Sequence, residues 1–347
     1  MAARPGPSPT LIEILRCPFC AVQVERRDGA LACPTCSRSF ELAGEIPLML
    51  HRDLPGAEAK LAESAGWVEK ARSDGWYEPD DAIDAALPFL ARDVPGWTDL
   101  TWLANGHSFQ VLLDRYVGGA RGLRVLELGA AKAWAAPYWR ERGCEYVATD
   151  ILVDAKIGLG RGEFYGEFGR VQADGEHLPF PDALFDLTYC LATLHHALDL
   201  PRMVAEMARV TGPGGVFDLT YCLATLHHAL DLPRMVAEMA RVTSPGGVVA
   251  GLNEGTRGMR ASPENPDQDG EKALGINEHV HTPWEYLAAF RRAGLAVRRL
   301  ERAEGWPPVP YGGMISRIPK VGMSLGTFVH LSLAGYASVS IYARKHA

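Results

Sequence analysis

The stretch RVLELG (residues 124–129) decides the fold, together with EYVATD (145–150) a short way beyond it. Both are apolar runs of strand length, and the second closes on Asp150. Between them lies WAAPYWRERG (134–143), a helical pattern that a glycine ends. A strand, a helix and a strand in this order predict two parallel strands joined by a crossover helix.

The same alternation continues toward the C-terminus. Helices are expected from Asp199 to Val210 and from Thr282, where Thr282 and Glu285 form a capping box and Pro283 takes the first turn. Further strands are expected at RVQAD (170–174), FDLTYC (185–190), VVAGLN (248–253), LAVRRLER (295–302) and YASVSIYA (336–343). This alternation predicts an α/β fold with a doubly wound, mostly parallel sheet.

A tandem repeat interrupts the pattern. Residues 185–216 and 217–248 are two copies of a strand–turn–helix–turn unit that differ only at Gly212 and Ser244. Two copies are too few for a solenoid, so one copy is predicted to be an insertion into a fold that needs only one. We expect the strand of the first copy to lie beside residues 125–128 and line the pocket. The surplus unit is then placed after it or added to the sheet.

The composition is that of a folded chain with more than one domain. The chain has 347 residues, of which 47% are hydrophobic and 22% charged, and this excludes a disordered protein. Residues 1–50 carry two cysteine pairs, residues 51–118 are predicted to be a helical linker or lid, and residues 119–347 carry the strand–helix alternation. The formal net charge of −7 argues against sequence-blind binding of nucleic-acid phosphates.

No targeting or membrane segment is expected. The first ten residues lack the apolar run of a signal peptide. Val321–Tyr342 carries no Asp, Glu, Lys or Arg, but its glycines, serines and final alternation favour a buried loop and a strand over a membrane helix. Seven cysteines that include two tight pairs indicate metal binding in a reducing compartment, so a cytoplasmic protein is expected.

Four cysteines form the first candidate site. Cys17 and Cys20 make one CxxC pair, and Cys33 and Cys36 make another. Two CxxC turns that face each other give the tetrahedral sulfur cage that zinc prefers. Four protein ligands leave no open position, so the metal is expected to be structural. Its binding should supply much of the folding free energy of so small a segment.

The ends of three predicted strands form the second candidate site. Glu127 and Gly129 close the first strand, Asp150 closes the second, and Asp174 lies just after the third. The carboxyl ends of parallel strands face one crevice, where doubly wound sheets bind ligands. A carboxylate at the second strand can accept hydrogen bonds from both hydroxyls of a ribose, and one at the third from an adenine amino group. The sequence therefore predicts a nucleoside pocket.

These residues resemble the class I S-adenosylmethionine-dependent methyltransferases of the type 11 kind. The resemblance rests on VLELG, the acid in VATDI, ADGEHLPFPDALFDLTYC (173–190), LHH and SPGGV. It implies a Rossmann-like methyltransferase sheet and an enzyme that transfers a methyl group from S-adenosylmethionine to an acceptor. It also implies a cofactor-binding set: Glu127 and Gly129 near the methionine part, Asp150 on the ribose, Asp174 and Gly175 near the adenine, and with them Ala131, Ile151 and Cys190.

The N-terminal segment resembles a second family. LIEILRCPFC (11–20) and GEIPLML (44–50) are similar to the zinc ribbons of small methyltransferase activator subunits, which bind a methyltransferase in trans. Here the methyltransferase-like part lies in the same chain. Ribosomal RNA guanine methyltransferases also pair an N-terminal zinc site with this fold, so RNA, a protein and a small metabolite stay open as acceptor, and RNA or a protein as partner of the ribbon.

Two further features bear on activity. The resembled family has glycines where this chain has Ala131 and Ala133, so a second interpretation is an impaired methyltransferase fold that serves as a zinc-ribbon binding module. His195 and His196 come after the fourth strand, and one of them is a candidate to take the proton of the acceptor. The alternative is that the pair packs the turn. Neighbouring strand residues face opposite ways, so at most one is expected to face the acceptor.

Overall fold

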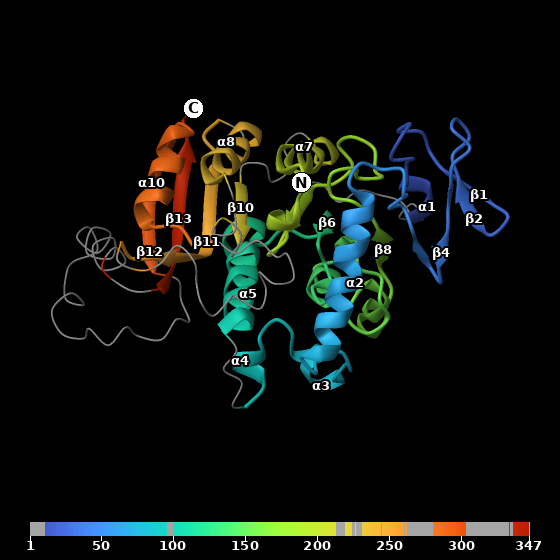
Figure 1. Cartoon of the computed structure of the whole chain (residues 1–347), viewed down its shortest axis with the longest axis horizontal. Helices are drawn as coiled ribbons and strands as arrows, with labels where there is room; N and C mark the ends of the chain where they lie inside the picture. Colours follow the sequence, from blue (N-terminus) through green and yellow to red (C-terminus); the bar gives the residue numbers. More distant parts are fainter. Residues whose placement is uncertain are drawn as a thin grey trace. The chain divides into compact units, whose positions relative to one another are not determined.

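The computed structural model describes residues 11–95, 100–212, 219–223, 226, 231–243, 245–259, 261, 280–302, 333 and 336–346 (Figure 1). The chain divides into two compact units. The first consists of Met1–Pro88, Val117–Thr193 and Ala197–Val216, and the second of Phe89–Tyr116, Leu194–His196 and Phe217–Ala347. The boundary between the tandem copies is therefore also a boundary between units.

Residues 11–50 form a ribbon of short strands within the first unit. Its elements are α1 (Leu11–Ile14), the antiparallel strands β1 (Glu25–Arg27), β2 (Ala30–Ala32) and β3 (Ser39–Phe40), and the pair β4 (Leu42–Ala43) and β5 (Ile46–Pro47). Leu15, Leu31 and Phe40 are buried in it. A core this small does not stabilise a fold by apolar burial alone, so the ribbon needs a further source of stability.

A four-stranded parallel sheet organises the rest of the first unit. Its strands, in the order β8-β7-β6-β9, are β8 (Gly169–Gln172), β7 (Glu145–Asp150), β6 (Arg124–Leu128) and β9 (Leu187–Cys190). Crossovers run through α6 (Ala136–Glu141) and η2 (Leu159–Tyr165), and α7 (Leu200–Val210) comes after β9. The predicted fold class is confirmed, and β6 is buried at four of its five residues, as a sheet covered on both faces requires.

The helix α2 (Ala57–Ser73) lies over the segment just after β7. Ala57 packs in one apolar cluster with Ile151 and with Phe19 of the ribbon, and Trp67 packs in a second cluster with Leu152. In Figure 1 this helix runs beside the sheet, and α3 (Asp81–Ala86) is the next helix along the chain. The helix thus covers the carboxyl end of β7, where the second predicted site lies.

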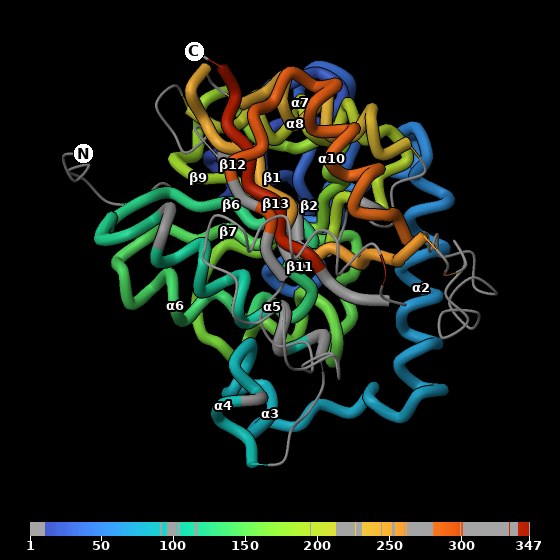
Figure 2. Tube along the Cα trace, turned by 90° about the vertical axis from the view of Figure 1, so that its left-hand side faces the viewer, coloured from blue at the N-terminus to red at the C-terminus, as the bar shows by residue number. Residues whose placement is uncertain are grey.

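The second unit holds another four-stranded sheet, in the order β10-β11-β13-β12. Figure 2 shows the red strand β13 running against β11 and β12. Its elements are β10 (Leu219–Leu223), α8 (Leu232–Val242), β11 (Val248–Arg257), α10 (Pro283–Arg292), β12 (Leu295–Arg302) and β13 (Tyr336–Lys345), with α4 (Leu90–Asp93), α5 (Leu100–Val111) and η1 (Leu112–Val117). The capping box predicted at Thr282 is present, since Glu285 donates its backbone N–H to the Thr282 hydroxyl and its carboxylate accepts from the Thr282 backbone.

The tandem copies occupy equivalent positions in the two sheets. In the first copy β9 pairs with β6, with Leu187 opposite Val125, which confirms the predicted neighbour. In the second copy β10 pairs with β11, with Leu219 opposite Val248. The surplus unit has thus been added to a sheet. Among the described residues no helix is long and apolar enough to cross a membrane, and the strand predicted at the end of Val321–Tyr342 is β13. The loop predicted before it lies outside the described residues.

Deleting residues 217–248 is expected to leave a folded protein that is more stable than the full chain. The remaining copy can then supply one strand that pairs with β6 on one side and with β11 on the other. The two sheets, which now end at β9 and β10, would become one continuous sheet. We expect the melting temperature to rise by about 5 °C, which corresponds to roughly 2 kcal/mol for a chain of this size. Scanning calorimetry measures the change, and a fall in melting temperature would show that the second copy is an essential part of the fold.

Candidate functional site

The four cysteines of the ribbon converge on one point. The Sγ atoms of Cys17, Cys20, Cys33 and Cys36 all lie within 4.8 Å of one another. The Cys17 and Cys36 sulfurs are 3.7 Å apart. In a tetrahedral site with Zn–S bonds of ~2.3 Å, two sulfurs lie about 3.8 Å apart, so the spacing fits zinc. Hydrogen bonding to the Arg38 backbone lowers the pKa of Cys36 to about 6, whereas burial raises the pKa of Cys17 to about 12, so the fit to zinc rests on the spacing of the sulfurs.

The loop after β6 keeps the backbone that glycines would adopt. Gly129 has φ 68°, and Ala131 and Ala133 have φ 45° and 58°, although alanine rarely enters this left-handed region. Gly129 also faces Thr193, whose Oγ1 would lie 2.1 Å from an added Cβ. The loop therefore has the geometry of the glycine-rich form, with strain stored at the two alanines.

Asp150 closes the loop from the end of β7. Its Oδ2 accepts a hydrogen bond from the Ala131 backbone N–H at 2.7 Å, and its Oδ1 accepts from the Leu152 N–H at 2.8 Å. Two backbone donors fix the carboxylate where β6 and β7 end side by side. Ile151, the next residue, packs on Leu50, Leu54 and Ala57, beneath the start of α2. The predicted ribose carboxylate is therefore held rigidly at the expected edge of the sheet.

Asp174 lies in a buried cluster of charged groups. Its Oδ1 contacts Lys60 Nζ of α2 and accepts from the Glu176 N–H at 2.9 Å, and its Oδ2 lies 2.7 Å from His177 Nδ1. Lys60 Nζ is also 3.0 Å from Glu176 Oε1. Side chains of this cluster expose 5% or less of their area. The predicted adenine acceptor is therefore fully engaged within the protein.

Glu127 sits in a network of aromatic hydroxyls. Tyr146 and Tyr189 both donate to its Oε2, the second at 2.7 Å, and Trp139 Nε1 donates to the Tyr189 hydroxyl at 2.9 Å. Burial raises the pKa of Glu127 to about 7. The carboxyl is thus half protonated near neutral pH, and its nearest partners in the described structure are tyrosines.

The remaining predicted residues lie on β9, its neighbouring turn and the loop after β8. Gly175 packs under Met203 of α7, whose Cε would lie 2.3 Å from an added Cβ. Cys190 ends β9 and is buried, and burial raises the pKa of its thiol to about 12, so it is no nucleophile. His195 and His196 lie in the short 3₁₀ turn η3 (Leu194–His196), not in a strand. The premise that they are neighbours in a strand does not hold, and the expectation that at most one faces the acceptor, like their catalytic role, stays a prediction.

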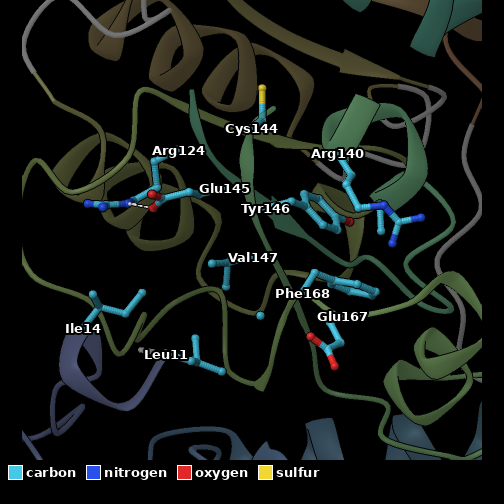
Figure 3. A pocket seen from close by; sticks show the side chains of 12 residues that line it. Leu11, Ile14, Arg124, Arg140, Cys144, Glu145, Tyr146, Val147, Glu167 and Phe168 are labelled. Atoms are coloured by element: carbon cyan, nitrogen blue, oxygen red, sulfur yellow. Dashed lines mark hydrogen bonds and ion pairs between the residues drawn. The ribbon is translucent and has the colours of Figure 1, made fainter. Parts of the chain in front are cut away.

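A cavity of about 200 Å³ lies away from these residues (Figure 3). It opens at the first residues of β6, β7 and β8, the amino ends of the strands, and contains none of the predicted cofactor residues. Arg124 and Glu145 at its edge pair with each other at 2.8 Å. The cavity is therefore separate from the predicted crevice at the carboxyl ends.

Two features of the site were missed from the sequence. Lys60 was not singled out, although it occupies a helical stripe of otherwise small or apolar residues, Ala57, Leu61, Val68 and Ala71. A lysine in such a stripe signals a buried acidic partner. The tyrosine network around Glu127 had no comparable signal, because its members come from three separate elements.

Comparison with protein families finds a methyltransferase model that matches part of this chain. Residues 126–217 match the family model described as "Methyltransferase domain", and residues 215–251 match it again. The second match begins at residue 215, two residues before the second tandem copy, and spans that copy, as expected for a duplicated piece of that domain.

Curated relatives agree with this match. A malonyl-[acyl-carrier protein] O-methyltransferase of Erwinia billingiae is 33% identical over 102 residues, 28% of this chain and 39% of its own length. The uncharacterized methyltransferase YcgJ of Bacillus subtilis is 35% identical over 92 residues, 25% of this chain and 36% of its own. The chain thus spans well under half the length of these relatives. Neither they nor the family match support the alternative of a non-catalytic binding module.

Solved structures of low identity are also similar. One is described as a complex between the Haloferax volcanii Trm112 methyltransferase activator and a methyltransferase, with TM-score 0.40, 15% identity, and coverage of 77% of this chain and 97% of that one. Another is an S-adenosylmethionine-dependent methyltransferase from Mesorhizobium loti, with TM-score 0.37, 18% identity, and coverage of 71% and 100%.

Proposed function

The chain contains a methyltransferase domain, and on that premise we propose that it transfers a methyl group from S-adenosylmethionine to a small metabolite, an RNA or a protein. The observation that supports this most is the loop after β6. It keeps left-handed φ at Ala131 and Ala133 and is tied to Asp150 at the end of the next strand. A loop that had lost its role would be expected to relax out of a backbone that alanine disfavours.

The residues present fit the cofactor in the loop and at the ribose position. S-adenosylmethionine, when bound, supplies a methyl group on a positively charged sulfur that an acceptor attacks in line. Gly129 lets Thr193 approach the loop closely, and Asp150 offers a fixed carboxylate to the ribose hydroxyls, whereas Asp174 has to exchange a protein partner before it can accept from the adenine. These groups bind and orient, and orientation alone contributes much of the rate in such a transfer. One of His195 and His196 is proposed to accept the proton of the acceptor.

The ribbon is proposed to hold a structural zinc ion and to bind RNA or a protein partner. Four thiolates at tetrahedral spacing leave no position for a substrate, which supports a structural role for the metal. In this chain the ribbon already contacts the end strand of the methyltransferase sheet, since Leu48 pairs with Gln172 of β8. Any further partner therefore has to use another face of the ribbon.

Titration with S-adenosylhomocysteine tests the proposal, and Ala131→Gly sharpens it. Glycine removes a methyl group from the loop, so we expect binding to tighten roughly threefold to tenfold, while relief of about 1 kcal/mol of backbone strain stabilises the fold. Ala183→Gly is the matched control, because Ala183 also has positive φ, 56°, but lies outside the loop. It should stabilise the fold without changing affinity. Absence of binding to both the wild type and A131G at millimolar ligand would overturn the proposed activity.

A further inference from the structure

A buried lysine, Lys60, contacts Asp174, the residue predicted to bind the adenine. Lys60 projects from the covered face of α2, and only 5% of its side chain is exposed. Its Nζ contacts Asp174 Oδ1 and lies 3.0 Å from Glu176 Oε1. The lysine thus bridges two carboxylates that lie just after β8, and it does so from an element outside the sheet.

This arrangement surrounds Asp174 with protein partners. Its Oδ1 is used by Lys60 and by the Glu176 N–H, and its Oδ2 by His177, which together take three of about four acceptor positions of a carboxylate. Only 1% of the Asp174 side chain is exposed, so an incoming donor can reach it only when one of these partners moves. Lys60 is the partner that α2 contributes, and its ammonium group is the strongest donor of the three. A nucleoside amino group therefore competes with Lys60 for Asp174.

We propose that Lys60 gates the cofactor pocket: it occupies on Asp174 the place of the adenine amino group, and cofactor binding shifts it to Glu176 as α2 moves outward. The inference rests on the proposed function. It adds to that function a residue, Lys60 on α2, that competes with the nucleoside for the Asp174 carboxylate.

The exchange leaves no charge without a partner. Before it, Lys60 neutralises part of the charge of two buried carboxylates, whose mutual repulsion would otherwise destabilise this part of the fold. After it, Lys60 retains Glu176, and the adenine amino group hydrogen-bonds Asp174. Glu176 is held in place meanwhile, because its Oε1 accepts from the backbone N–H groups of Leu198 and Asp199 at 2.7 and 3.0 Å.

Glycines flank α2 at both ends and allow the helix to move. Gly56 precedes the helix with φ 74° and makes no side-chain cap, and Gly75 lies just beyond its last turn with φ 80°. Glycines at both ends can absorb the dihedral changes of a hinge. Between them the helix is held by the clusters around Ala57 and Trp67 and by the ion pairs of Lys60.

Calorimetric titration with S-adenosylhomocysteine tests the gate in the full-length, zinc-loaded protein. Lys60→Met keeps the length and apolar stem of the side chain but frees Asp174, so binding should tighten about tenfold or more relative to wild type. Lys70→Met is the matched control, since Lys70 is on the same helix but pairs with the exposed Asp74 at 2.9 Å. It should bind like wild type. Equal or weaker binding by K60M overturns the gate while the proposed function stands.

A measurement on the wild type does not depend on the variant folding. Hydrogen exchange of the α2 amides, residues 57–73, should become faster when S-adenosylhomocysteine binds, because the helix leaves its covered position. In K60M the same amides should exchange fast before the ligand is added. Binding that slows or leaves unchanged the exchange of α2 in the wild type overturns the gate. Absence of binding in wild type, K60M and K70M alike overturns the proposed function and the gate together.

Discussion

Replacing Cys33 by serine is expected to abolish zinc binding and to unfold residues 11–50. The ribbon buries few apolar side chains, whereas zinc contributes about 10–16 kcal/mol to the folding of small four-ligand domains. The loss of one thiolate therefore removes more free energy than the ribbon core can replace. Metal analysis should give about one zinc per wild-type chain and almost none for C33S, and hydrogen exchange should show residues 11–50 unprotected.

Cys144→Ser is the matched control for this experiment. Cys144 is a thiol that lines the separate cavity and does not belong to the four-cysteine cluster. It should leave zinc content and ribbon protection unchanged. A C33S variant with a protected ribbon, or freshly purified wild-type protein without zinc, would contradict a structural metal site.

The second large effect expected is a loss of stability with rising pH that depends on Glu127. Burial raises its pKa from 4.5 to about 7 in the folded chain. Between these two values the folded state holds a proton that the unfolded state has released, so the free energy of unfolding falls as pH rises through this window. The full loss, reached above pH ~7, is about 3 kcal/mol.

Glu127→Gln should remove most of that pH dependence. Both tyrosine hydroxyls donate to one carboxylate oxygen, which the amide oxygen of glutamine can replace without a charge to desolvate. Urea unfolding at pH 5 and pH 8 measures the effect, and the difference between the two should shrink by about 2–3 kcal/mol in E127Q. Glu141→Gln, at an exposed position of α6, should keep the wild-type dependence. Equal slopes in E127Q and wild type would show that Glu127 is ionised throughout.

The predicted strands and helices agree with the structure because their signals are local. Short apolar runs such as residues 124–128 and 145–150, bounded by helical patterns, indicate covered parallel strands by their length, and Thr282 with Glu285 marks a helix start by its own hydrogen bonds. The cysteine cluster was equally readable, since the two CxxC turns fix the ligands before any long-range contact forms. Local sequence signals were therefore enough to predict most of the fold and the four-cysteine site.

The rest depends on contacts that no local pattern encodes. The strands of the two copies have the same propensity, so the prediction that the first copy pairs with β6, which the structure confirms, rested on the segments that flank each copy. The partners of Asp174 and Glu127 come from α2, β7 and β9, far apart in the chain. The sequence predicted that these acids line a crevice. That other side chains of the protein already bind them is a result of tertiary packing.

The contact between the ribbon and β8 has a consequence for solubility. β8 is the last strand in the order β8-β7-β6-β9, and its outer side meets the ribbon, where Met49 donates its N–H to the Gln172 carbonyl at 2.9 Å. A terminal strand left bare offers unpaired peptide groups to other chains and promotes aggregation. The ribbon acts as a cover for that strand, and a chelator would uncover it. Light scattering should therefore rise in the metal-stripped protein. Aggregation should begin only as zinc is lost.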